Sequence, residues 1–316
     1  MTNWAIIGGS GFAETTCIPT LESTNSATLL GCCGSNPEKN AELTRKFGLP
    51  KTFNNIEEVG LDPDVEAVWI ASPTGMHGEQ AESLMRSGKA VLIEKPLELN
   101  YAKAKKIVRA ALETNAQAAV GFHQRFKLAH IHAKSLISSG DIGNPVFVNA
   151  LFMVKYPSPP GKWRQHRDSS GGWSINDIGT HLIDTVKYVL GAEVRKAKAV
   201  FGNNQFRYET DDIFSAVLEL NNDSIATISA STAVDNPKTR LEIIGTKGSL
   251  NLENSFMGST EMFVNGQQLP VFNESMVYVD QIHAFQKLLL GQQSEISNLG
   301  DGLDNVYWVE QMVKET

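Results

Sequence analysis

The sequence predicts an α/β protein of two domains: an N-terminal doubly wound dinucleotide-binding domain, and a C-terminal α+β domain with a large, mainly antiparallel open sheet. Over the first ~120 residues, short β-rich runs alternate with helical patterns, the order typical of βαβ units and a parallel sheet. A glycine-rich turn follows the first of these runs. Beyond residue 122, runs of alternating polarity are separated by turn sequences, which indicates antiparallel strands.

In the first domain, residues 1–121, the β-rich runs predict strands at 4–7, 28–33, 67–71, 90–93 and 118–122. Helical patterns separate them at 37–47, 77–87 and 101–115. The last of these follows Asn100, a good N-cap residue, and carries apolar residues at helical spacing. We therefore expect the strands to form one parallel sheet covered by helices.

In the second domain, residues 122–316, we expect strands at 146–154, 213–220, 225–231, 241–244 and 261–264. A long helix is predicted at about 178–190, ending at Gly191, and a final one at 305–315 that packs back across the molecule. The three prolines within 156–161 predict a mobile loop. This domain is expected to bind substrate and to support a homodimer or homotetramer, because an open sheet leaves one face for a second copy.

Composition excludes several classes of protein. A chain of 316 residues favours two domains over one core. No segment is long and apolar enough for a membrane span, and the N-terminus lacks a basic leader and cleavage site, so we expect a cytoplasmic protein. The net charge of −7 argues against a nucleic-acid partner. The three cysteines, Cys17, Cys32 and Cys33, are an odd number and are expected to be reduced and buried.

The glycine-rich turn follows the first strand and opens a helix. In this position, backbone N–H groups and a helix N-terminus can bind a pyrophosphate. Its match to G-x-G-x-x-G/A is imperfect because Ser10 stands at the middle glycine, so an ordinary tight turn explains the segment nearly as well. The candidate cofactor-binding residues here are Gly8, Gly9, Ser10, Gly11, Phe12 and Ala13.

The end of the second strand bears on the choice between NADP and NAD. An acidic residue at this position usually binds the adenosine ribose of NAD. No acid occupies the strand end at Cys33, and the residues that can bind a 2′-phosphate instead are Gly34, Ser35, Asn36 and Lys39. This favours NADP over NAD. Alternatively, Asn36 and Pro37 serve only to begin the next helix.

A charged pair, Glu94-Lys95, comes directly after a buried strand and before Pro96. That position is the carboxyl edge of the sheet, where open α/β folds bind ligands. A lysine there can donate to a substrate hydroxyl or exchange a proton with it, and a nearby cationic nicotinamide would lower its pKa. A surface lysine before a proline turn is the alternative.

A second candidate constellation lies on the predicted helix, where the spacing puts Asp177, His181 and Asp184 on one face. A polar stripe on a helix that otherwise packs in the core is costly unless it lines a cavity. A histidine near a carboxylate has a pKa suited to proton transfer. The alternative is a structural histidine with satisfied hydrogen bonds.

Together these motifs resemble the Gfo/Idh/MocA family of sugar and polyol oxidoreductases over nearly the whole chain. The segments that carry the resemblance are Gly8 to Ala13, 71–77, Glu94-Lys95-Pro96, Trp163-Arg164, Gly171-Gly172, 177–184 and 241–250. The resemblance implies a Rossmann domain, a hydride transferred between nicotinamide C4 and a sugar carbon, and a cis peptide before Pro96. It also implies that Lys95, Asp177 and His181 form the catalytic group.

The resemblance further implies roles for individual residues. His181 is the principal acid/base, Lys95 polarises the same substrate oxygen, and Asp177 orients substrate hydroxyls, with the division between Lys95 and His181 left open. The residues expected beside the cofactor are Ser72, Thr74, His77, Glu94, Lys95, Trp163 and Arg164. Those expected beside the substrate, besides the catalytic three, are Arg125, Tyr156 and Trp173. Thr74 and His77 could instead cap a helix, and Trp163 could be core.

These observations favour an NADP-preferring dehydrogenase or reductase acting on a sugar, polyol or related cyclic carbohydrate. A regulator that senses a dinucleotide or sugar without turnover, and an NAD-dependent glycoside hydrolase on the same fold, stay open as alternatives. No metal site is predicted, since His130 and His132 point to different faces of a helix.

Overall fold

The computed structural model describes residues 1–9, 11–156, 162–203 and 205–314. The chain forms two compact units, one of Met1–Phe122 with Tyr278–Val306 and the other of His123–Val277 with the chain from Tyr307 onward. The first division lies one residue from the expected boundary after residue 121. The segment Tyr278–Val306, which the sequence analysis assigned to the second domain, belongs to the first unit. The expected loop at 156–161 lies outside the described residues except for Tyr156.

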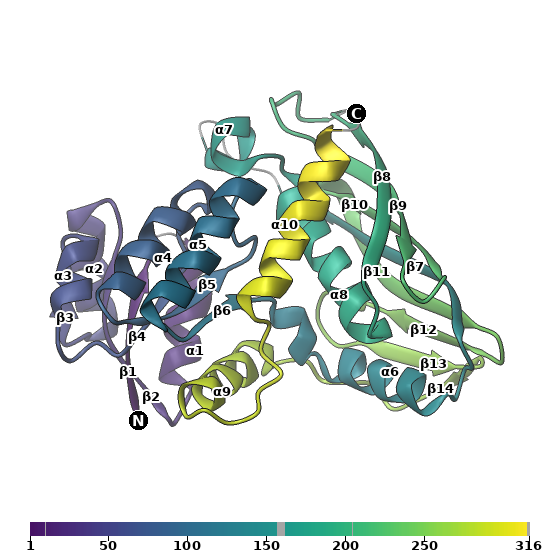
Figure 1. Cartoon of the computed structure of the whole chain (residues 1–316), viewed down its shortest axis with the longest axis horizontal. Helices are drawn as coiled ribbons and strands as arrows, with labels where there is room; N and C mark the ends of the chain where they lie inside the picture. Colours follow the sequence, from purple (N-terminus) through teal and green to yellow (C-terminus); the bar gives the residue numbers. More distant parts are fainter. Residues whose placement is uncertain (10, 157–161, 204, 315–316) are drawn as a thin grey trace. The chain divides into compact units, whose positions relative to one another are not determined.

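The first unit contains a six-stranded parallel sheet, and this confirms the predicted fold (Figure 1). In spatial order its strands are β3 (Lys51–Thr52), β2 (Ala27–Cys33), β1 (Thr2–Ile7), β4 (Ala67–Ile70), β5 (Ala90–Glu94) and β6 (Ala118–Gly121). The chain order reverses between β1 and β4, the position at which doubly wound sheets bind ligands. Only the two-residue β3 was not expected.

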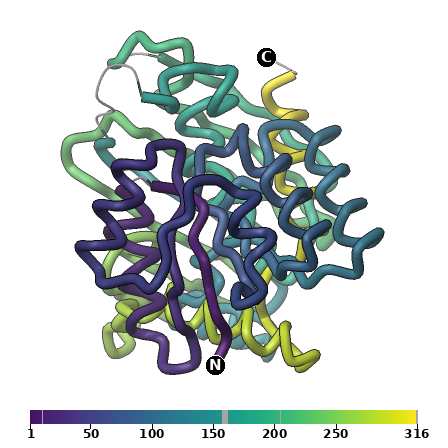
Figure 2. Tube along the Cα trace, turned by 90° about the vertical axis from the view of Figure 1, so that its left-hand side faces the viewer, coloured from purple at the N-terminus to yellow at the C-terminus, as the bar shows by residue number. Residues whose placement is uncertain are grey.

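Helices cover both faces of this sheet; in Figure 2 those of the N-terminal part are purple to blue and α9 is yellow-green. They are α1 (Ile18–Glu22), α2 (Pro37–Phe47), α3 (Ile56–Leu61), α4 (His77–Arg86), α5 (Tyr101–Thr114) and α9 (Val277–Leu289). Alternate residues of β1 face opposite layers: Ile7 packs in the core cluster that includes α3, α4 and α5, whereas the Trp4 ring meets Phe285 of α9 at 5.3 Å. The predicted N-cap is confirmed, since the Asn100 side chain accepts a hydrogen bond from Lys103 N–H.

The second unit is built on an eight-stranded sheet in which only β7 and β10 pair in parallel, so the expected mainly antiparallel sheet is confirmed. In spatial order its strands are β14 (Gln267–Gln268), β13 (Glu261–Val264), β12 (Ser249–Glu253), β11 (Ala233–Gly245), β7 (Pro145–Lys155), β10 (Ile225–Ser231), β9 (Ile213–Leu220) and β8 (Val194–Gly202). Strands β8, β12 and β14 were not predicted from the sequence.

One face of this sheet packs against α6 (Leu128–Ser139), α8 (Thr180–Leu190) and the end of α10 (Leu299–Lys314) in a single apolar cluster. The expected helix at 178–190 needs a correction, because a π-helical turn, η5 (Ser174–Gly179), precedes α8. A Cβ at Gly179 would lie 2.6 Å from the Phe214 ring, so this turn packs on the sheet more closely than any other residue allows.

All three cysteines are free and buried, as expected. Burial raises the pKa of the Cys32 thiol to about 12 and that of Cys33 to about 11, so neither is a reactive thiolate near neutral pH. Among the described residues, no helix combines the length and the apolar character that a membrane span needs.

Candidate functional site

The carboxyl edge of the first unit's sheet brings together three segments that are far apart in sequence. Strands β1, β4 and β5 are direct neighbours and run parallel, so the residues that follow them share one edge. These residues are Gly8 after β1, Ser72 after β4 and Lys95 after β5. The fold therefore places the glycine-rich turn and the candidate lysine at the same edge.

The glycine-rich turn is shaped by close contacts that exclude side chains. Gly8 has a φ of +134°, and a Cβ there would lie 2.7 Å from the Ala71 carbonyl oxygen. A Cβ at Gly34 would lie 2.8 Å from Gly9 N. At Gly11, in contrast, a Cβ would meet nothing within 4 Å. The turn thus combines a tight base with open space at the helix start, and this suits the pyrophosphate of a dinucleotide.

The helix after this turn begins in an unusual way. Ala13–Cys17 form a π-helical turn, η1, that leads into α1. Ala13 is buried, and the Phe12 ring contacts Tyr278 edge-on at 6.0 Å. Ser10 lies outside the described residues.

The end of β2 carries the residues on which the cofactor preference depends. Ser35 and Asn36 are exposed, and the Asn36 side chain caps α2 by accepting from Glu38 and Lys39 N–H. The Lys39 ammonium lies 3.4 Å from Glu14 and 3.2 Å from Glu42. Asn36 therefore does begin the helix, as the alternative held, while its exposure leaves it accessible.

Asn40 is a functional candidate that the sequence analysis missed. Its buried side chain accepts from Gly34 N–H and donates to the carbonyl oxygens of Gly34 and Phe53. It therefore fixes the backbone that lies against Gly9. The signal was present in the sequence, because Asn40 is three residues before Leu43 on the apolar face of the helix.

The two charged residues at the end of β5, Glu94 and Lys95, differ in burial. Glu94 is buried and accepts a hydrogen bond from Trp69 Nε1 at 3.1 Å. Lys95 is partly exposed. The peptide bond between Lys95 and Pro96 is cis, as the family resemblance implied.

His77 lies between two main-chain carbonyl groups at this edge. Its Nδ1 is 2.9 Å from the Pro96 oxygen and its Nε2 is 2.9 Å from the Ser72 oxygen. The pKa of His77 is lowered, mainly because the ring is fully buried; the two acceptors oppose that effect and the charge of Lys95 adds to it. Both ring nitrogens thus face main-chain carbonyls rather than a ligand, and the neutral ring donates its one N–H to one of them.

Thr74 and Ser72, the other two residues expected beside the cofactor on this segment, differ in their exposure to solvent. Thr74 is buried. The Ser72 hydroxyl is partly exposed and donates to Gln80 Oε1 at 2.5 Å.

In the second unit, Arg164 and Asp177 form an ion pair, with Arg164 Nε 2.8 Å from Asp177 Oδ2. The guanidinium of Arg164 also lies 4.4 Å from the Trp163 ring centroid. Burial raises the pKa of Tyr156, and the charge of Asp177 adds to that rise while Arg164 opposes it. Four of the predicted site residues are therefore neighbours: Tyr156, Trp163, Arg164 and Asp177.

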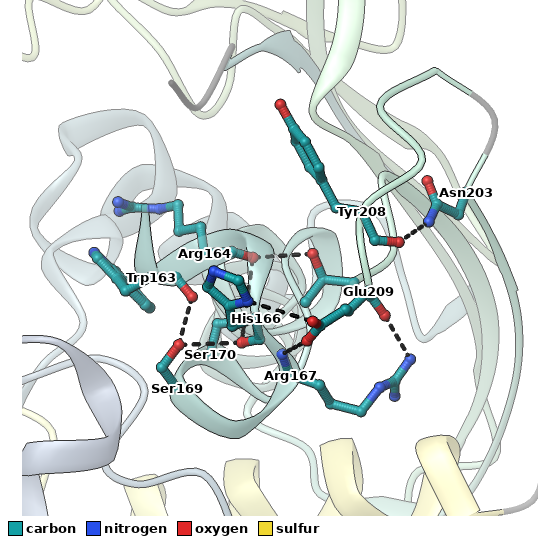
Figure 3. A network of polar contacts seen from close by, with 10 residues as sticks. Trp163, Arg164, His166, Arg167, Ser169, Ser170, Asn203, Tyr208 and Glu209 are labelled. Carbon is teal, nitrogen blue, oxygen red and sulfur yellow. Dashed lines mark hydrogen bonds and ion pairs between the residues drawn. The ribbon is translucent and has the colours of Figure 1, made fainter. Parts of the chain in front are cut away.

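The segment that carries Trp163 and Arg164 is anchored through its backbone. Its elements are η4 (Trp163–Gln165) and α7 (Arg167–Ser170), and Figure 3 shows their polar contacts. The Arg164 carbonyl accepts from the Thr210 hydroxyl, the Trp163 carbonyl accepts from Ser169, and Arg167 donates to Glu209. In Figure 3 the Trp163 and Arg164 side chains project to the same side.

His181 is buried in the first turn of α8, and its ring lies against that of His123. The two centroids are 4.9 Å apart and the planes cross at 71°. His123 belongs to η3 (His123–Phe126) and was not among the predicted site residues. Because a lone histidine after a strand has no distinctive spacing to another helix, no signal in the sequence links the two.

Arg125 and Asp184 form a buried ion pair. Arg125 Nε lies 3.1 and 3.0 Å from the two Asp184 oxygens, and Nη2 lies 2.6 Å from Oδ1. The guanidinium also lies 5.5 Å from the Tyr188 ring centroid. The polar stripe of the predicted helix thus contacts three different partners: Asp177 pairs with Arg164, His181 packs on His123, and Asp184 binds Arg125.

Trp173, expected beside the substrate, is only 1% exposed. Its ring stacks on Phe206 at 5.6 Å and on Tyr208 at 5.9 Å, and those two rings stack on each other. The exposed area of this aromatic stack therefore belongs to Phe206 and Tyr208, and the ring of Trp173 serves as its base.

A separate cavity of about 240 Å³ lies in the second unit, lined by Arg167, Gly171, Phe201, Asp211 and Val313. None of these was a predicted site residue. The Asp211 carboxylate accepts from the backbone N–H groups of Trp173 and Ile175, so it anchors the start of η5. Among the described residues, no three His, Cys, Asp or Glu side chains gather in a way that could hold a metal ion.

Family models match both halves of the chain. The model described as an oxidoreductase family with an NAD-binding Rossmann fold matches residues 2–122, and the Gfo/Idh/MocA C-terminal domain matches residues 130–251. The chain belongs to the Gfo/Idh/MocA family. It is therefore an oxidoreductase with an NAD-binding Rossmann domain, as the sequence motifs indicated.

Two curated proteins are similar to this chain in sequence. The 1,5-anhydro-D-fructose reductase of Ensifer adhaerens is 30% identical over 79% of this chain and 75% of its own length. The scyllo-inositol 2-dehydrogenase (NAD(+)) of Bacillus subtilis is 33% identical over 70% of this chain and 65% of its own length. In structure, the aldose-aldose oxidoreductase of Caulobacter crescentus, complexed with glycerol, superposes with a TM-score of 0.90 over 99% of this chain and 96% of that one, at 22% identity.

Proposed function

We propose that this Gfo/Idh/MocA protein is an NADP-preferring dehydrogenase or reductase that acts on a sugar, a polyol or a related cyclic carbohydrate. The observation that carries this proposal is the shared edge of β1, β4 and β5, where the glycine-rich turn and Lys95 lie in one unit. The names of the two similar curated proteins, an anhydrofructose reductase and an inositol dehydrogenase, support the substrate class.

The residues at this edge suit a dinucleotide. The open space at Gly11 and the tight base at Gly8 leave backbone N–H groups available to a pyrophosphate, with Gly9, Phe12 and Ala13 completing the turn. When bound, the dinucleotide supplies a hydride donor or acceptor at nicotinamide C4. Ser72, with its partly exposed hydroxyl, and Lys95 follow β4 and β5 at the same edge of the sheet and are the polar groups that we assign to the cofactor there.

The proton that accompanies hydride transfer is assigned to the chain's own side chains. His181 accepts a proton from the substrate hydroxyl, or returns it to the carbonyl, and Lys95 polarises the same oxygen. Asp177 binds neighbouring hydroxyls of the substrate through its carboxylate. Arg164 and Trp163 keep that carboxylate in place, since the guanidinium contacts both.

The preference for NADP rests on the end of β2. No acidic residue occupies the end of β2, which Ser35 and Asn36 follow, and Lys39 lies in the first turn of α2. The contacts of Lys39 with Glu14 and Glu42 are at the surface, where an ion pair contributes only ~0–1 kcal/mol. A 2′-phosphate can therefore draw the ammonium away from them, because charge-assisted bonds to phosphate are stronger.

The reaction is tested by the absorbance of NADPH and NADH with a panel of sugars and polyols. We expect net oxidation or reduction of the cofactor, and loss of turnover in Lys95→Ala and His181→Ala. Lys106→Ala and His132→Ala are the controls, because Lys106 is exposed on α5 and His132 packs on Phe272. Full turnover in Lys95→Ala and His181→Ala would overturn the site assignment.

The same measurement separates the alternatives. A regulator binds the dinucleotide without turnover of any substrate. A glycoside hydrolase cleaves a glycoside while the total NAD(P)H stays constant. Either result would contradict the proposed function.

The cofactor preference is tested by quenching of tryptophan fluorescence with NADPH and NADH. Lys39→Ala is expected to weaken NADPH binding about tenfold while NADH binding changes less than about twofold. Lys46→Ala is the matched control, since Lys46 also pairs with Glu14 but lies on the last turn of α2. Tighter binding of NADH by the wild-type protein would contradict the preference.

We also propose that the second unit mediates assembly into a homodimer or homotetramer. Val200, Val217 and Ile244 are exposed on strands whose alternate residues form the core, so they lie on the outer face of the sheet. Light scattering after size-exclusion chromatography should give the mass of two or four chains, and Val217→Glu should lower it. A monomer at high protein concentration would contradict this proposal.

A further inference from the structure

The pair of His123 and His181 has a neighbour that determines the protonation of one ring. Gln124, next to His123 in η3, is 3% exposed, and its Nε2 lies 3.1 Å from His123 Nε2. The same Nε2 lies 3.2 Å from the carbonyl oxygen of Phe256. One amide nitrogen therefore contacts both a carbonyl oxygen and an imidazole nitrogen.

The Phe256 carbonyl determines which way the Gln124 amide points. A carbonyl oxygen only accepts, so the amide nitrogen must face it; the opposite orientation would place two oxygens against each other. An amide nitrogen carries two hydrogens. With one donated to Phe256, the second is available to His123 Nε2.

The tautomer of His123 follows from this orientation. Because Gln124 donates, His123 Nε2 must accept, and its ring hydrogen is then on Nδ1. A protonated His123 would set an N–H group against the amide N–H₂. The amide therefore favours the neutral ring.

Gln124 is itself held by a second histidine. His130 Nδ1 lies 2.8 Å from the Gln124 main-chain oxygen, and His130 Nε2 lies 2.8 Å from the Ser255 hydroxyl. Burial lowers the pKa of His130 to about 3, so this ring is neutral and donates from Nδ1. The segment 254–256 thus contacts Gln124 on two sides, through His130 and through the Phe256 carbonyl.

We propose that His123 is a positioning residue for His181: a neutral imidazole in the Nδ1–H tautomer that fixes the His181 ring without placing a second positive charge beside it. This inference rests on the proposed function, in which His181 becomes positively charged during turnover. A charged ring at 4.9 Å would disfavour that state. The charged residues near the pair in sequence include Arg125 and Asp184, which pair with each other, and Asp177, which pairs with Arg164.

The tautomer is measured directly by long-range ¹H–¹⁵N NMR of the ¹⁵N-histidine-labelled full chain near pH 7, with His123 assigned by its loss in His123→Phe. We expect the pattern of a neutral ring protonated on Nδ1. In Gln124→Glu, whose carboxylate can only accept, we expect His123 to become protonated on Nε2 as well. An Nε2–H tautomer or an imidazolium in the wild-type protein would overturn the proposal, and this result does not depend on turnover.

Kinetics test the consequence for His181. His123→Ala is expected to lower kcat about tenfold with KM within about twofold, because a slightly misplaced catalytic group slows the reaction. His123→Phe, which keeps a ring against His181 and carries no charge, should recover most of kcat, and Gln124→Glu should lower it. His132→Ala is the control.

The two proposals fail in different ways. A wild-type protein that turns over no sugar or polyol with NADPH or NADH contradicts the proposed function. A wild-type protein that turns over while His123→Ala retains full kcat contradicts the role of His123 alone.

Discussion

His77 is joined to Pro96 by a hydrogen bond of 2.9 Å from the ring Nδ1 to the main-chain oxygen, across 19 residues of sequence. The other ring nitrogen lies 2.9 Å from the Ser72 main-chain oxygen, so one buried side chain lies between the end of β4 and the end of β5, and its single ring hydrogen serves one of the two carbonyls. Since Pro96 directly follows Lys95, this contact fixes the backbone from which the Lys95 side chain extends.

Replacement of His77 is expected to affect both stability and turnover. A neutral His77 ring has one N–H, so His77→Ala leaves one carbonyl oxygen at this edge without its donor, which costs about 1–3 kcal/mol of unfolding free energy. It also frees the backbone at Lys95, so kcat should fall by about tenfold or more. Urea unfolding and steady-state kinetics measure the two effects, and His283→Ala, an exposed histidine on α9, is the control. Unchanged values for both would refute the role given to His77.

The glycine-rich turn offers a pair of substitutions with opposite effects. Gly11→Ala adds a Cβ where nothing lies within 4 Å, so folding should be unaffected while the methyl group occupies the space assigned to the pyrophosphate. Gly8→Ala places a Cβ 2.7 Å from Ala71 O at a φ of +134°, so the protein itself should be destabilised by more than about 1 kcal/mol. Thermal unfolding and NADPH titration separate the two outcomes. If Gly11→Ala binds NADPH as tightly as the wild type, the pyrophosphate lies elsewhere.

Breaking the buried Arg125–Asp184 pair should lower the free energy of unfolding far more than breaking a surface pair. Asp184→Asn leaves a guanidinium that is 11% exposed without its counter-charge, which costs about 3–5 kcal/mol of unfolding free energy. Arg109→Ala, which breaks the exposed pair with Glu113, should cost less than about 1 kcal/mol. Urea unfolding of both variants tests this contrast, and equal losses would contradict it.

Burial of the His130 ring should make the free energy of unfolding depend on pH. Burial lowers its folded-state pKa to about 3 from an ordinary value of 6.5, so the unfolded chain binds the extra proton first as pH falls. Above pH 6.5 the protonation of His130 does not change the free energy of unfolding. Between pH 6.5 and 3 it lowers the free energy of unfolding progressively, by up to about 5 kcal/mol. His130→Gln should therefore be less stable at pH 7 but lose less stability on acidification. Urea midpoints from pH 7 to pH 4 measure this slope, with His283→Gln expected to behave as the wild type.

Much of the fold was predictable because its signals are local. The strands at 213–220, 225–231 and 261–264 and the helix at 37–47 match the structure residue for residue, since alternation and cap residues act over a few positions. The strands that were missed, such as β8 and β12, have burial patterns that depend on which neighbour covers them. The helix α9 was also missed. It belongs to the first unit although it follows the second unit's strands in sequence.

The residues of the candidate site also fall into those that local motifs predicted and those that only the structure revealed. Lys95, Asp177 and His181 were predicted from short motifs, whereas His123 and the partners of Trp173 became visible only when distant segments were in contact. Asn40 had a local signal on the apolar face of its helix, but its partner Phe53 is known only from the structure. His77 was predicted as a cofactor-side residue, and the structure gives both of its ring nitrogens to main-chain carbonyls. The spacing of Asp177 and His181 assumed an α-helix, whereas the structure has a π-helical turn at Ser174–Gly179, where Gly179 packs closely on Phe214.

The sequence by itself determined the class of fold, the two-part architecture, the glycine-rich turn and the residue types that can carry proton transfer, because periodicity and motif spacing are properties of neighbouring residues. The tertiary structure alone decided which polar groups meet, as in His77 with Pro96, Arg164 with Asp177 and His123 with His181. The physical reason is that a hydrogen bond or ring contact acts over a few ångströms, and only folding brings residues that are distant in sequence within that range.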